Sequence, residues 1–362
     1  MFSGVEKTMI SVFCTISIEF NNLGIRLYDL GKSISVFGIE IAYYGIIIAI
    51  GIMAGIIIAC LEAKHTGQDP EDYIDFAIYA VIFSIIGARL YYVIFEWDYY
   101  SAHLADIINL RKGGLAIYGG IIAAILICFV YTRIKHMSFP KMADTACLGL
   151  ISGQIIGRWG NFFNREAYGT VTSDSNPLAM RIYFDDNFSI SNVPEKVVTA
   201  MEEKMGQSLS EIGYIQVHPT FLYESLWNLS VLILILIFRK HKKYDGEVIL
   251  WYLAGYAFGR FFIEGLRTDQ LILPYFNVPV SQLLSALLFV ATAVILICKR
   301  IAIKKRHKRR KQNMINEIKK QINDTRKKLD GMIDSEPDRG KILKVSQELD
   351  ELISKYIQLT AN

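Results

Sequence analysis

The chain has 362 residues, of which 52% are hydrophobic and 20% are charged, with 39 Lys and Arg against 35 Asp and Glu and a formal net charge of +4. So many charges in so apolar a chain must be segregated, which excludes an evenly mixed sequence. The five cysteines are scattered without pairing or ligand spacing, so we expect no metal site. We also expect no cofactor and no nucleic-acid partner.

The first forty residues contain one short apolar run, Met9–Ile18, which is too short to cross a bilayer. Its flanks lack the small-residue cleavage site of a signal peptide. We therefore expect residues 1–40 to form an outer-surface segment packed on the rest of the protein.

Seven apolar runs of near-spanning length follow. A bilayer needs about 20 such residues per helix, with about 17 as the lower limit, and we count the two shortest runs because polar loops bracket them. The pattern predicts an all-α polytopic membrane protein with about seven transmembrane helices in residues 41–300. The runs are Ile41–Leu61, Tyr73–Phe95, Ala116–Tyr131, Ala143–Ile156, Phe221–Phe238, Glu247–Ile263 and Pro279–Cys298.

Basic residues predict the orientation of the spans. Arg133 and Lys135, Arg239–Lys243 and Lys299–Lys311 all fall on one side, which the positive-inside rule makes cytoplasmic, so the N-terminus is outside. The loop Glu62–Asp72 dissents because it is acidic, but acids count little in that rule. Residues 165–217 form a long outside stretch, predicted as a small extracytoplasmic head with short strands near Ala179–Phe184 and an amphipathic helix at Pro194–Met205.

The most polar motif stands where the fourth span ends, and it contains Arg158, Asn161, Asn164 and Glu166. An unpaired charge at the edge of hydrocarbon costs several kcal/mol and indicates a functional site. An arginine that snorkels to lipid headgroups explains one Arg, but it does not explain the whole group.

Further polar clusters interrupt the other spans. Arg89 lies deep in the second, where pairing with a buried acid or a helix C-terminus is the structural alternative. Glycines before a span have no Cβ, so another helix or a lipid headgroup can lie close to the backbone there. Arg260 and Glu264, four apart, share a helix face with Tyr256 and could simply neutralise each other. The remaining cluster residues are Gly113, Gly114, Tyr118, His218 and Glu224.

We expect Arg158, Tyr118, Glu224 and Arg260 to surround one cavity in the outer half of the bundle. Two guanidiniums suit an anionic phospholipid head because the planar fork binds phosphate oxygens bidentately and keeps its charge.

The motifs, in order over about residues 35–300, resemble the prolipoprotein diacylglyceryl transferase family. The resemblance implies a seven-helix enzyme of the bacterial cytoplasmic membrane, with its active site at the outer leaflet. It implies transfer of the diacylglyceryl group from phosphatidylglycerol to the lipobox cysteine of a prolipoprotein signal peptide. The motifs are Gly157-Arg158-x-Gly160-Asn161-Phe162-x-Asn164-x-Glu166, Tyr43-Tyr44-Gly45, Gly87-Ala88-Arg89, Leu115–Gly120, His218–Glu224 and Gly259-Arg260-Phe261-x-x-Glu264.

The resemblance also implies roles for single residues. Catalytic roles fall to Arg158, Asn161, Arg260, Glu264 and Tyr118, although some members carry a histidine where this chain has Tyr118, and tyrosine, with a pKa near ~10, is a poor base. The identity of the base therefore stays open. Substrate binding falls to Arg158, Arg260, Tyr44, Glu166, Gly169, His218, Glu224, Tyr256, Gly113 and Gly114.

After a basic linker at 301–311, residues 312–362 carry two apolar stripes separated by a break at Asp334–Gly340, which predicts a cytoplasmic helical hairpin. A coiled-coil dimer or a solvated tail is the alternative. The second stripe resembles small two-helix aspartyl-phosphate phosphatases that act on a sporulation response regulator. The matching residues are Ser346, Gln347, Glu348, Leu349 and Asp350.

Two other classes of function compete with the transferase. A transporter or channel would also place ionisable residues inside a membrane bundle, but it predicts repeated halves, and we find no internal repeat. A receptor-like scaffold would act through the tail.

Overall fold

The computed structural model describes residues 15–110, 113–273, 278–334 and 339–361. Residues 9–14 of the short apolar run and residues 335–338 of the predicted break lie outside the described residues. The chain divides into two compact units, residues 1–293 and 294–362, and each is described by itself.

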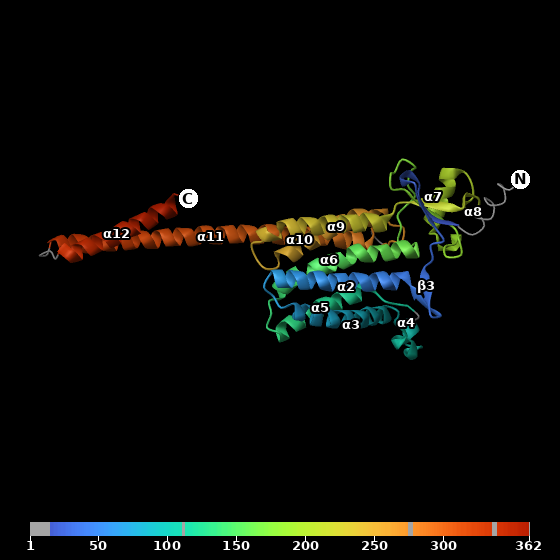
Figure 1. The fold of residues 1–362 in the computed structure, drawn as a ribbon, viewed down its shortest axis with the longest axis horizontal. Helices are drawn as coiled ribbons and strands as arrows, with labels where there is room; N and C mark the ends of the chain where they lie inside the picture. Colours follow the sequence, from blue (N-terminus) through green and yellow to red (C-terminus); the bar gives the residue numbers. More distant parts are fainter. Residues whose placement is uncertain (1–14, 111–112, 274–277, 335–338, 362) are drawn as a thin grey trace. The chain divides into compact units, whose positions relative to one another are not determined.

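The first unit is a bundle of long helices that lie side by side (Figure 1). Short elements connect them: α4 (Trp97–Tyr100), η2 (Leu104–Ile108) and η5 (Arg239–His241). The long helices are α2 (Tyr43–His65), α3 (Pro70–Phe95), α5 (Ile117–Ile134), α6 (Phe139–Asn164), α9 (Thr220–Phe238), α10 (Glu247–Leu266) and the start of α11 (Val280–Asp334).

Among the described residues, five helices are long and apolar enough to cross a membrane: α2, α3, α5, α9 and α11. These five helices support the prediction of a polytopic membrane protein. The other two predicted runs lie in α6 and α10, which reach 26 and 20 residues but carry charged side chains such as Asp144, Arg158 and Arg260.

Glycines bring α2 and α6 into backbone contact. A Cβ added at Gly55 would lie 2.8 Å from the carbonyl oxygen of Gly149, and one added at Gly149 would meet the carbonyl of Gly55. Gly51 and Gly153 face each other in the same way one helical turn along the seam. The absence of side chains at these positions sets the spacing of the two helices.

Ion pairs join the loops at the end of the bundle away from the polar motif. Glu62 pairs with Arg239, and Asp72 lies 3.1 Å from Lys135 Nζ. Asp144 of α6 caps α10, because its carboxylate accepts from the backbone N–H groups of Gly246 and Ile249, both at 2.9 Å. The acidic loop that dissented from the positive-inside pattern therefore carries the partners of basic residues in neighbouring loops.

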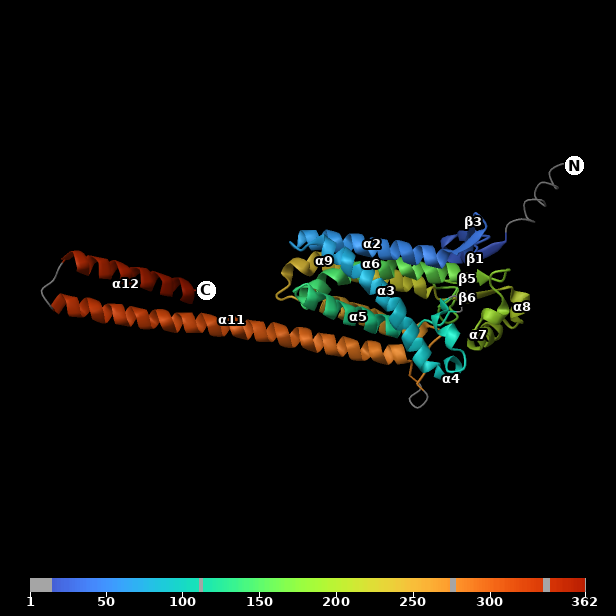
Figure 2. The ribbon, with the colours of Figure 1, turned by 90° about the horizontal axis from the view of Figure 1, so that it is seen from below.

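The other end of the bundle carries a head with a four-stranded sheet in the described structure, in the order β2-β1-β5-β6. Figure 2 shows this sheet beyond the helix ends. The strands are antiparallel, and Ile18 of β1 pairs with Ile182 of β5. The strands are β1 (Ile16–Phe20), β2 (Ile25–Tyr28), β5 (Met180–Tyr183) and β6 (Tyr214–Val217).

The mostly helical structure agrees with the expected all-α class, with the sheets confined to the head and to a hairpin before α2. Part of residues 1–40 contributes two strands to the head sheet, which the sequence did not indicate. The cause is a pairing between strands more than 150 residues apart, which leaves no local pattern. The remaining strands, β3 (Ser33–Val36) and β4 (Ile39–Ala42), form an exposed hairpin that leads into α2.

One helix of the head matches its prediction closely. The amphipathic helix expected at Pro194–Met205 is α7 (Glu195–Met205), which is followed by α8 (Leu209–Ile212). Val197 and Met201 of α7 pack on Ile182 and Ile215 of the sheet, so the head has its own apolar core.

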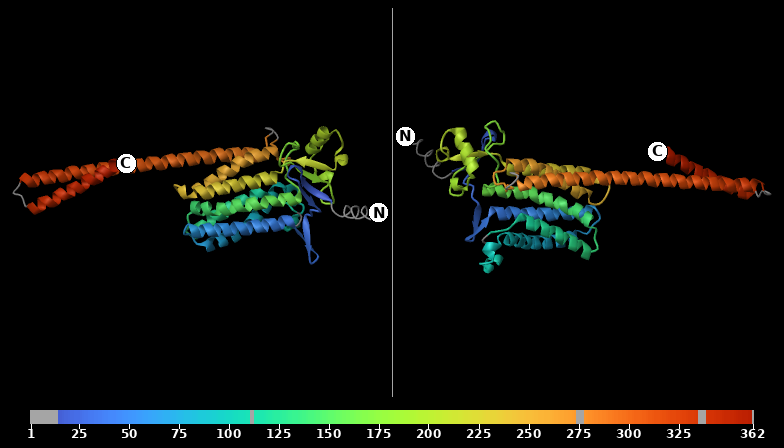
Figure 3. Two further views of the ribbon diagram at one scale, coloured as in Figure 1. Left: turned by 45° about the horizontal axis from the view of Figure 1, so that its top comes forward. Right: turned by 180° about the vertical axis from the view of Figure 1, so that it is seen from behind.

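The second unit consists of the later part of α11 and of α12 (Arg339–Thr360), which lie side by side as a helical hairpin (Figure 3). Ile318 of α11 and Val345 and Leu349 of α12 are buried, and Lys319 Nζ lies 5.5 Å from the Tyr356 ring. The residues Ile318, Val345, Leu349 and Tyr356 lie on the two apolar stripes that predicted a hairpin.

Candidate functional site

An ionic cluster joins the ends of α6, α9 and α10 next to the head. Glu224 of α9 is its centre: one carboxylate oxygen lies 2.5 Å from Arg158 Nε of α6, and the other accepts from Arg260 Nη1 of α10. Arg260 also pairs, at 2.5 Å, with Glu264 one turn further along its own helix. The structure thus brings together four residues predicted from three separate motifs.

Hydrogen bonds between the helices determine how far along the bundle each cluster residue lies. Ser225 Oγ donates to the carbonyl of Ile155 at 3.0 Å, which aligns α9 with α6. Trp227 Nε1 donates to the carbonyl of Gly255 at 2.8 Å, and its ring occupies the space beside Gly259, which aligns α9 with α10. The positions of Arg158, Glu224 and Arg260 at one level follow from this register.

Arg267 and Asp269 extend the cluster and were not predicted. Arg267 Nη2 donates to Asp269 at 2.7 Å, and its guanidinium lies within 4.0 Å of Glu224 and Glu264. Burial alone would raise the pKa of Asp269, but the hydrogen bond and charge of Arg267 outweigh burial and hold that pKa below its usual range. The available signal was spacing, since Arg267 stands three residues after Glu264 and seven after Arg260.

The cluster is balanced in charge, with three guanidiniums and three carboxylates. The Glu224 and Glu264 side chains are only 5% exposed, whereas the Arg158 side chain is 22% exposed. The buried carboxylates therefore hold the guanidiniums in fixed orientations, and Arg158 presents the most accessible one.

The rest of the first motif divides into two groups. Asn161 and Asn164 both donate to Glu166, at 2.9 and 3.3 Å, and Glu166 is exposed. Arg165 instead is buried with positive φ at the end of α6, and it donates to Asp185 and to the carbonyl of Leu30 in the head. One arginine of the motif thus serves the site and the other attaches the head.

His218 and Gly169 lie between the head and the helix ends. His218 Nδ1 is 3.1 Å from the Tyr223 hydroxyl and 3.3 Å from Asn176 Nδ2, and burial lowers the pKa of His218. The N–H of Gly169 donates to the carbonyl of His218, and a Cβ here would lie 2.7 Å from the His218 Cβ. Gly169 therefore permits a close chain crossing beside the cluster.

Tyr44 and Tyr256 flank the cluster from two helices. A Cβ on Gly160 would lie 2.7 Å from the Tyr44 ring, so Tyr44 of α2 packs on α6 one turn from Asn164. Tyr256 of α10 lies one turn from Arg260, and its ring stacks on Tyr252.

Tyr118 is the second residue of α5, and Gly113 and Gly114 precede that helix. Among the described residues, ion pairs join Arg158, Glu224 and Arg260 directly. None of these contacts includes Tyr118, so its place around the same cavity stays a prediction.

Arg89 fits the structural alternative of pairing with a helix C-terminus, because three of its acceptors are carbonyls at the end of η2. Its guanidinium donates to five backbone carbonyls, and this wraps the connection between α3 and α5 around one buried charge. Gly113 and Gly114, both with positive φ, supply two of those carbonyls. The five acceptors are Asp106, Ile107, Asn109, Gly113 and Gly114.

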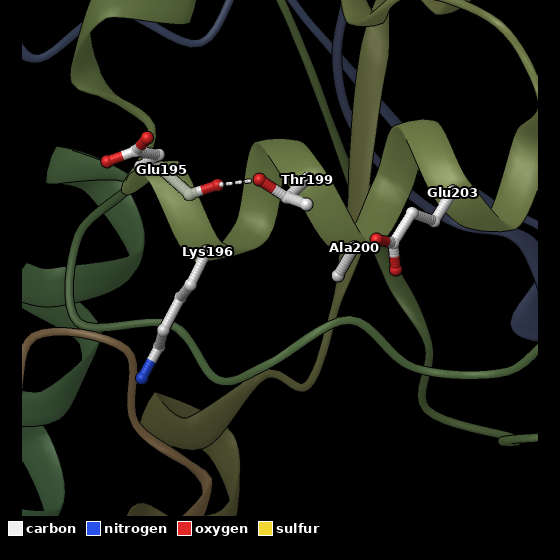
Figure 4. Close-up of a pocket in the computed structure, with 5 residues that line it drawn as sticks. All are labelled: Glu195, Lys196, Thr199, Ala200 and Glu203. Atoms are coloured by element: carbon white, nitrogen blue, oxygen red, sulfur yellow. Dashed lines mark hydrogen bonds between the residues drawn. The ribbon is translucent and has the colours of Figure 1, made fainter.

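An open pocket lies over α7 in the head, and none of the predicted site residues lines it (Figure 4). Lys196 extends from α7 and donates to the carbonyl of Arg267 at 3.4 Å, so the pocket adjoins the end of α10. Its lining is Glu195, Lys196, Thr199, Ala200 and Glu203.

The five residues of the tail motif separate by exposure on α12. Gln347, Glu348 and Asp350 are exposed, Ser346 is half-buried and Leu349 is in the hairpin core. In the described part of the chain, no group of three or more His, Cys, Asp or Glu is arranged to hold a metal ion.

A membrane bundle with charged residues locked in place beside an extramembrane head defines a class of integral membrane protein with a polar site at one end of its helices. The chain belongs to the prolipoprotein diacylglyceryl transferase family, whose model matches residues 32–298. It is a transferase of that family. A second model, described as Spo0E-like sporulation regulatory protein, matches residues 318–358.

Relatives support the first match. A phosphatidylglycerol–prolipoprotein diacylglyceryl transferase of Clostridioides difficile is 44% identical over 66% of this chain and 84% of its own length. Proteins of the same name from Finegoldia magna and Listeria innocua are 41% and 42% identical, over 73% and 74% of this chain and 93% and 89% of their own lengths.

Proposed function

We propose that this protein transfers the diacylglyceryl group of phosphatidylglycerol to the lipobox cysteine thiol of prolipoprotein signal peptides and releases glycerol phosphate, the first step of bacterial lipoprotein maturation. The names of the relatives and the family match support the substrates. The observation that carries the proposal is the cluster of Arg158, Glu224 and Arg260, which suits a phosphate that gains charge as it leaves.

The reaction requires two bonds to change. The cysteine sulfur forms a bond to the terminal glyceryl carbon, the bond from that carbon to the phosphate oxygen breaks, and the electron pair leaves with glycerol phosphate. The thiol, with an ordinary pKa near ~8.5, loses its proton to a base. Arg158 and Arg260 stabilise the charge that develops on the phosphate, and Glu224 and Glu264 hold both guanidiniums in position before the reaction begins.

The remaining predicted residues serve binding in this proposal. Asn161 donates to the leaving phosphate, and Glu166 orients Asn161. Gly169, His218 and Tyr44 shape the walls next to the cluster. Tyr118 at the start of α5, with Gly113 and Gly114 before that helix, contacts the lipid, and the base is one of the carboxylates or a group on the substrate.

The proposed topology places α6 and α10 in the membrane with the five apolar helices, which makes seven spans. The N-terminus and the head are then outside the bacterial cytoplasmic membrane, and the site faces the outer leaflet. The tail lies in the cytoplasm, because the basic loops around Lys135, Arg239 and Lys299–Lys311 favour that side.

A second activity is proposed for the tail. The Spo0E-like match and the exposure of Gln347 and Asp350 support a hairpin that binds a response regulator and removes its aspartyl phosphate. Leu349, which is buried, holds the helix pair together.

The test of the transferase is an assay in membranes with phosphatidylglycerol and a lipobox peptide. We expect release of glycerol phosphate together with lipidated peptide, whereas a transporter or channel would release none. Arg158→Ala should lower kcat/KM by at least about tenfold, since hydrogen bonds to charged groups contribute about 1.5–3 kcal/mol. Arg158→Lys should also be impaired, because an ammonium lacks the bidentate fork.

The matched control is Arg133→Ala, which removes an exposed arginine at the far end of α5. Its turnover should equal that of the unchanged protein. Normal turnover by Arg158→Ala, at equal amounts in the membrane, would contradict the phosphate-binding role.

A further inference from the structure

A second polar layer lies one helical turn below the ionic cluster, on the side away from the head. Gln154, Asn228 and Tyr256 each stand four residues from Arg158, Glu224 and Arg260, so each shares a helix face with one cluster residue. One turn of α-helix rises about 5.4 Å, which sets the separation of the two layers.

Contacts between the helices place these three residues at the same depth. The hydrogen bond from Ser225 to the carbonyl of Ile155 brings the turn that holds Asn228 beside the turn that holds Gln154. The bond from Trp227 to the carbonyl of Gly255 brings Asn228 and Tyr256 to neighbouring positions on α9 and α10.

Neither amide of this layer is fully satisfied within the described residues, although the Gln154 side chain also contacts the Tyr252 hydroxyl. Asn228 is 2% exposed, yet its side chain has no hydrogen bond in the described structure. Gln154 Oε1 is buried without a hydrogen-bond partner. A buried polar group without a partner costs about 1–3 kcal/mol, so two such amides at one level point to a polar ligand that joins them.

Resting on the proposed function, we propose that Asn228 and Gln154 bind the acyl ester carbonyls of the lipid substrate and position its glyceryl group for transfer. A diacyl phospholipid held by its phosphate at the ionic cluster, with its chains directed away from the head, places its ester carbonyls several bonds further along, at the level of this layer. Ester carbonyls only accept hydrogen bonds, and primary amides supply two N–H donors each. A half turn of the terminal amide exchanges its N and O ends, which allows Gln154 to present its NH₂ to the carbonyl.

This arrangement explains why neutral amides, and not charged groups, occupy the second layer. A guanidinium there would compete with Arg158 and Arg260 for the phosphate. A neutral donor discriminates between lipids with and without carbonyl groups while leaving the phosphate in the first layer.

The experiment compares two phosphatidylglycerols, one with ester-linked and one with ether-linked chains. Both have the same reacting carbon and the same leaving group, but the ether lipid lacks the carbonyl oxygens. The unchanged protein should use the ester lipid with a kcat/KM roughly three- to tenfold higher for each hydrogen bond made. Asn228→Leu and Gln154→Leu should each lower kcat/KM for the ester lipid by roughly that factor and leave the ether lipid nearly unchanged.

Ser225→Ala is the matched control, because it removes a hydrogen bond between α9 and α6 at the same depth without removing a free amide. It should change turnover of both lipids by the same factor. If Asn228→Leu lost the same factor of kcat/KM on both lipids, the ester-to-ether ratio would stay at the value of the unchanged protein, and this would overturn the proposal. Absence of transfer from either lipid by the unchanged protein would instead overturn the proposed function.

Discussion

Two arginines seven residues apart, Arg158 and Arg165, show how a side chain's neighbours decide its use. Both lie in the last turns of α6 or directly after it, and both bind a carboxylate. Arg158 keeps part of its surface exposed, while Arg165 is fully enclosed and holds the head to the helix end. The positive φ of Arg165 turns the chain there, which no spacing rule indicates.

At the level of single residues we predict that Arg267 is required for transfer. Arg267→Ala removes the partner of Asp269 and Glu264, and it removes one positive charge from the ionic cluster where the phosphate would bind. We therefore expect kcat/KM to fall by roughly 10- to 100-fold. Asp269→Asn, which keeps the shape but loosens Arg267, should be impaired less. The assay with phosphatidylglycerol and lipobox peptide measures both, and full activity of Arg267→Ala would place this residue outside the machinery.

We also predict a pH effect at His218. Burial lowers the pKa of His218 below its ordinary value near ~6.5, so the unfolded chain takes up this proton at a higher pH than the folded protein. The contribution of His218 to stability is therefore present above that ordinary value and declines as the pH falls below it.

The measurement is the midpoint of thermal unfolding in detergent, for the unchanged protein and for His218→Gln, at pH 7.5 and 5.5. The difference between the two proteins should shrink or reverse at the lower pH. A difference that is the same at both values would show that His218 does not titrate in this range.

At the level of elements, the seam between α2 and α6 gives the next prediction. Gly149→Val places side-chain atoms against the carbonyl of Gly55, so the helices must separate, at a cost of about 1–3 kcal/mol. Gly157→Ala on the same helix is the matched control, because its Cβ would only touch Ile48 at 3.4 Å. The unfolding temperature should fall clearly for Gly149→Val and little for Gly157→Ala, and equal values would contradict tight packing at the seam.

Local pattern determines which elements the sequence predicts. The apolar runs and the α7 stripe repeat within a few residues, and both are found as helices. The pairing of β1 with β5 brings together residues far apart in the chain, so its strands could not be assigned to one sheet beforehand.

The site follows the same division. Arg158, Glu224, Arg260 and Glu264 were predicted because charge inside an apolar run is conspicuous. Arg267 and Asp269 were missed because they follow the end of α10, where charged residues are ordinary. For Arg89 the sequence offered a helix C-terminus as an alternative, but it did not indicate the carbonyls of Gly113 and Gly114, because backbone acceptors have no sequence signature.

At the level of the whole molecule, the two family matches occupy separate stretches, 32–298 and 318–358, and the basic residues 301–311 lie between them. We predict that truncation after Lys311 leaves transfer by the first unit unchanged, because every residue of the ionic cluster lies before residue 270. The transferase assay on membranes with equal amounts of both proteins measures this, and a large loss of activity would show that the tail is needed.

The glycine seam between α2 and α6 also has a consequence for entropy. A glycine has no rotamers to lose, so Gly51, Gly55, Gly149 and Gly153 bring two helices together without the side-chain entropy loss of up to about 1.5–2 kcal/mol that each long side chain would incur. The entropy cost falls instead on the backbone, because a glycine loses more backbone freedom in a helix than any other residue, so the close approach of α2 and α6 is reached at the expense of each helix's own stability.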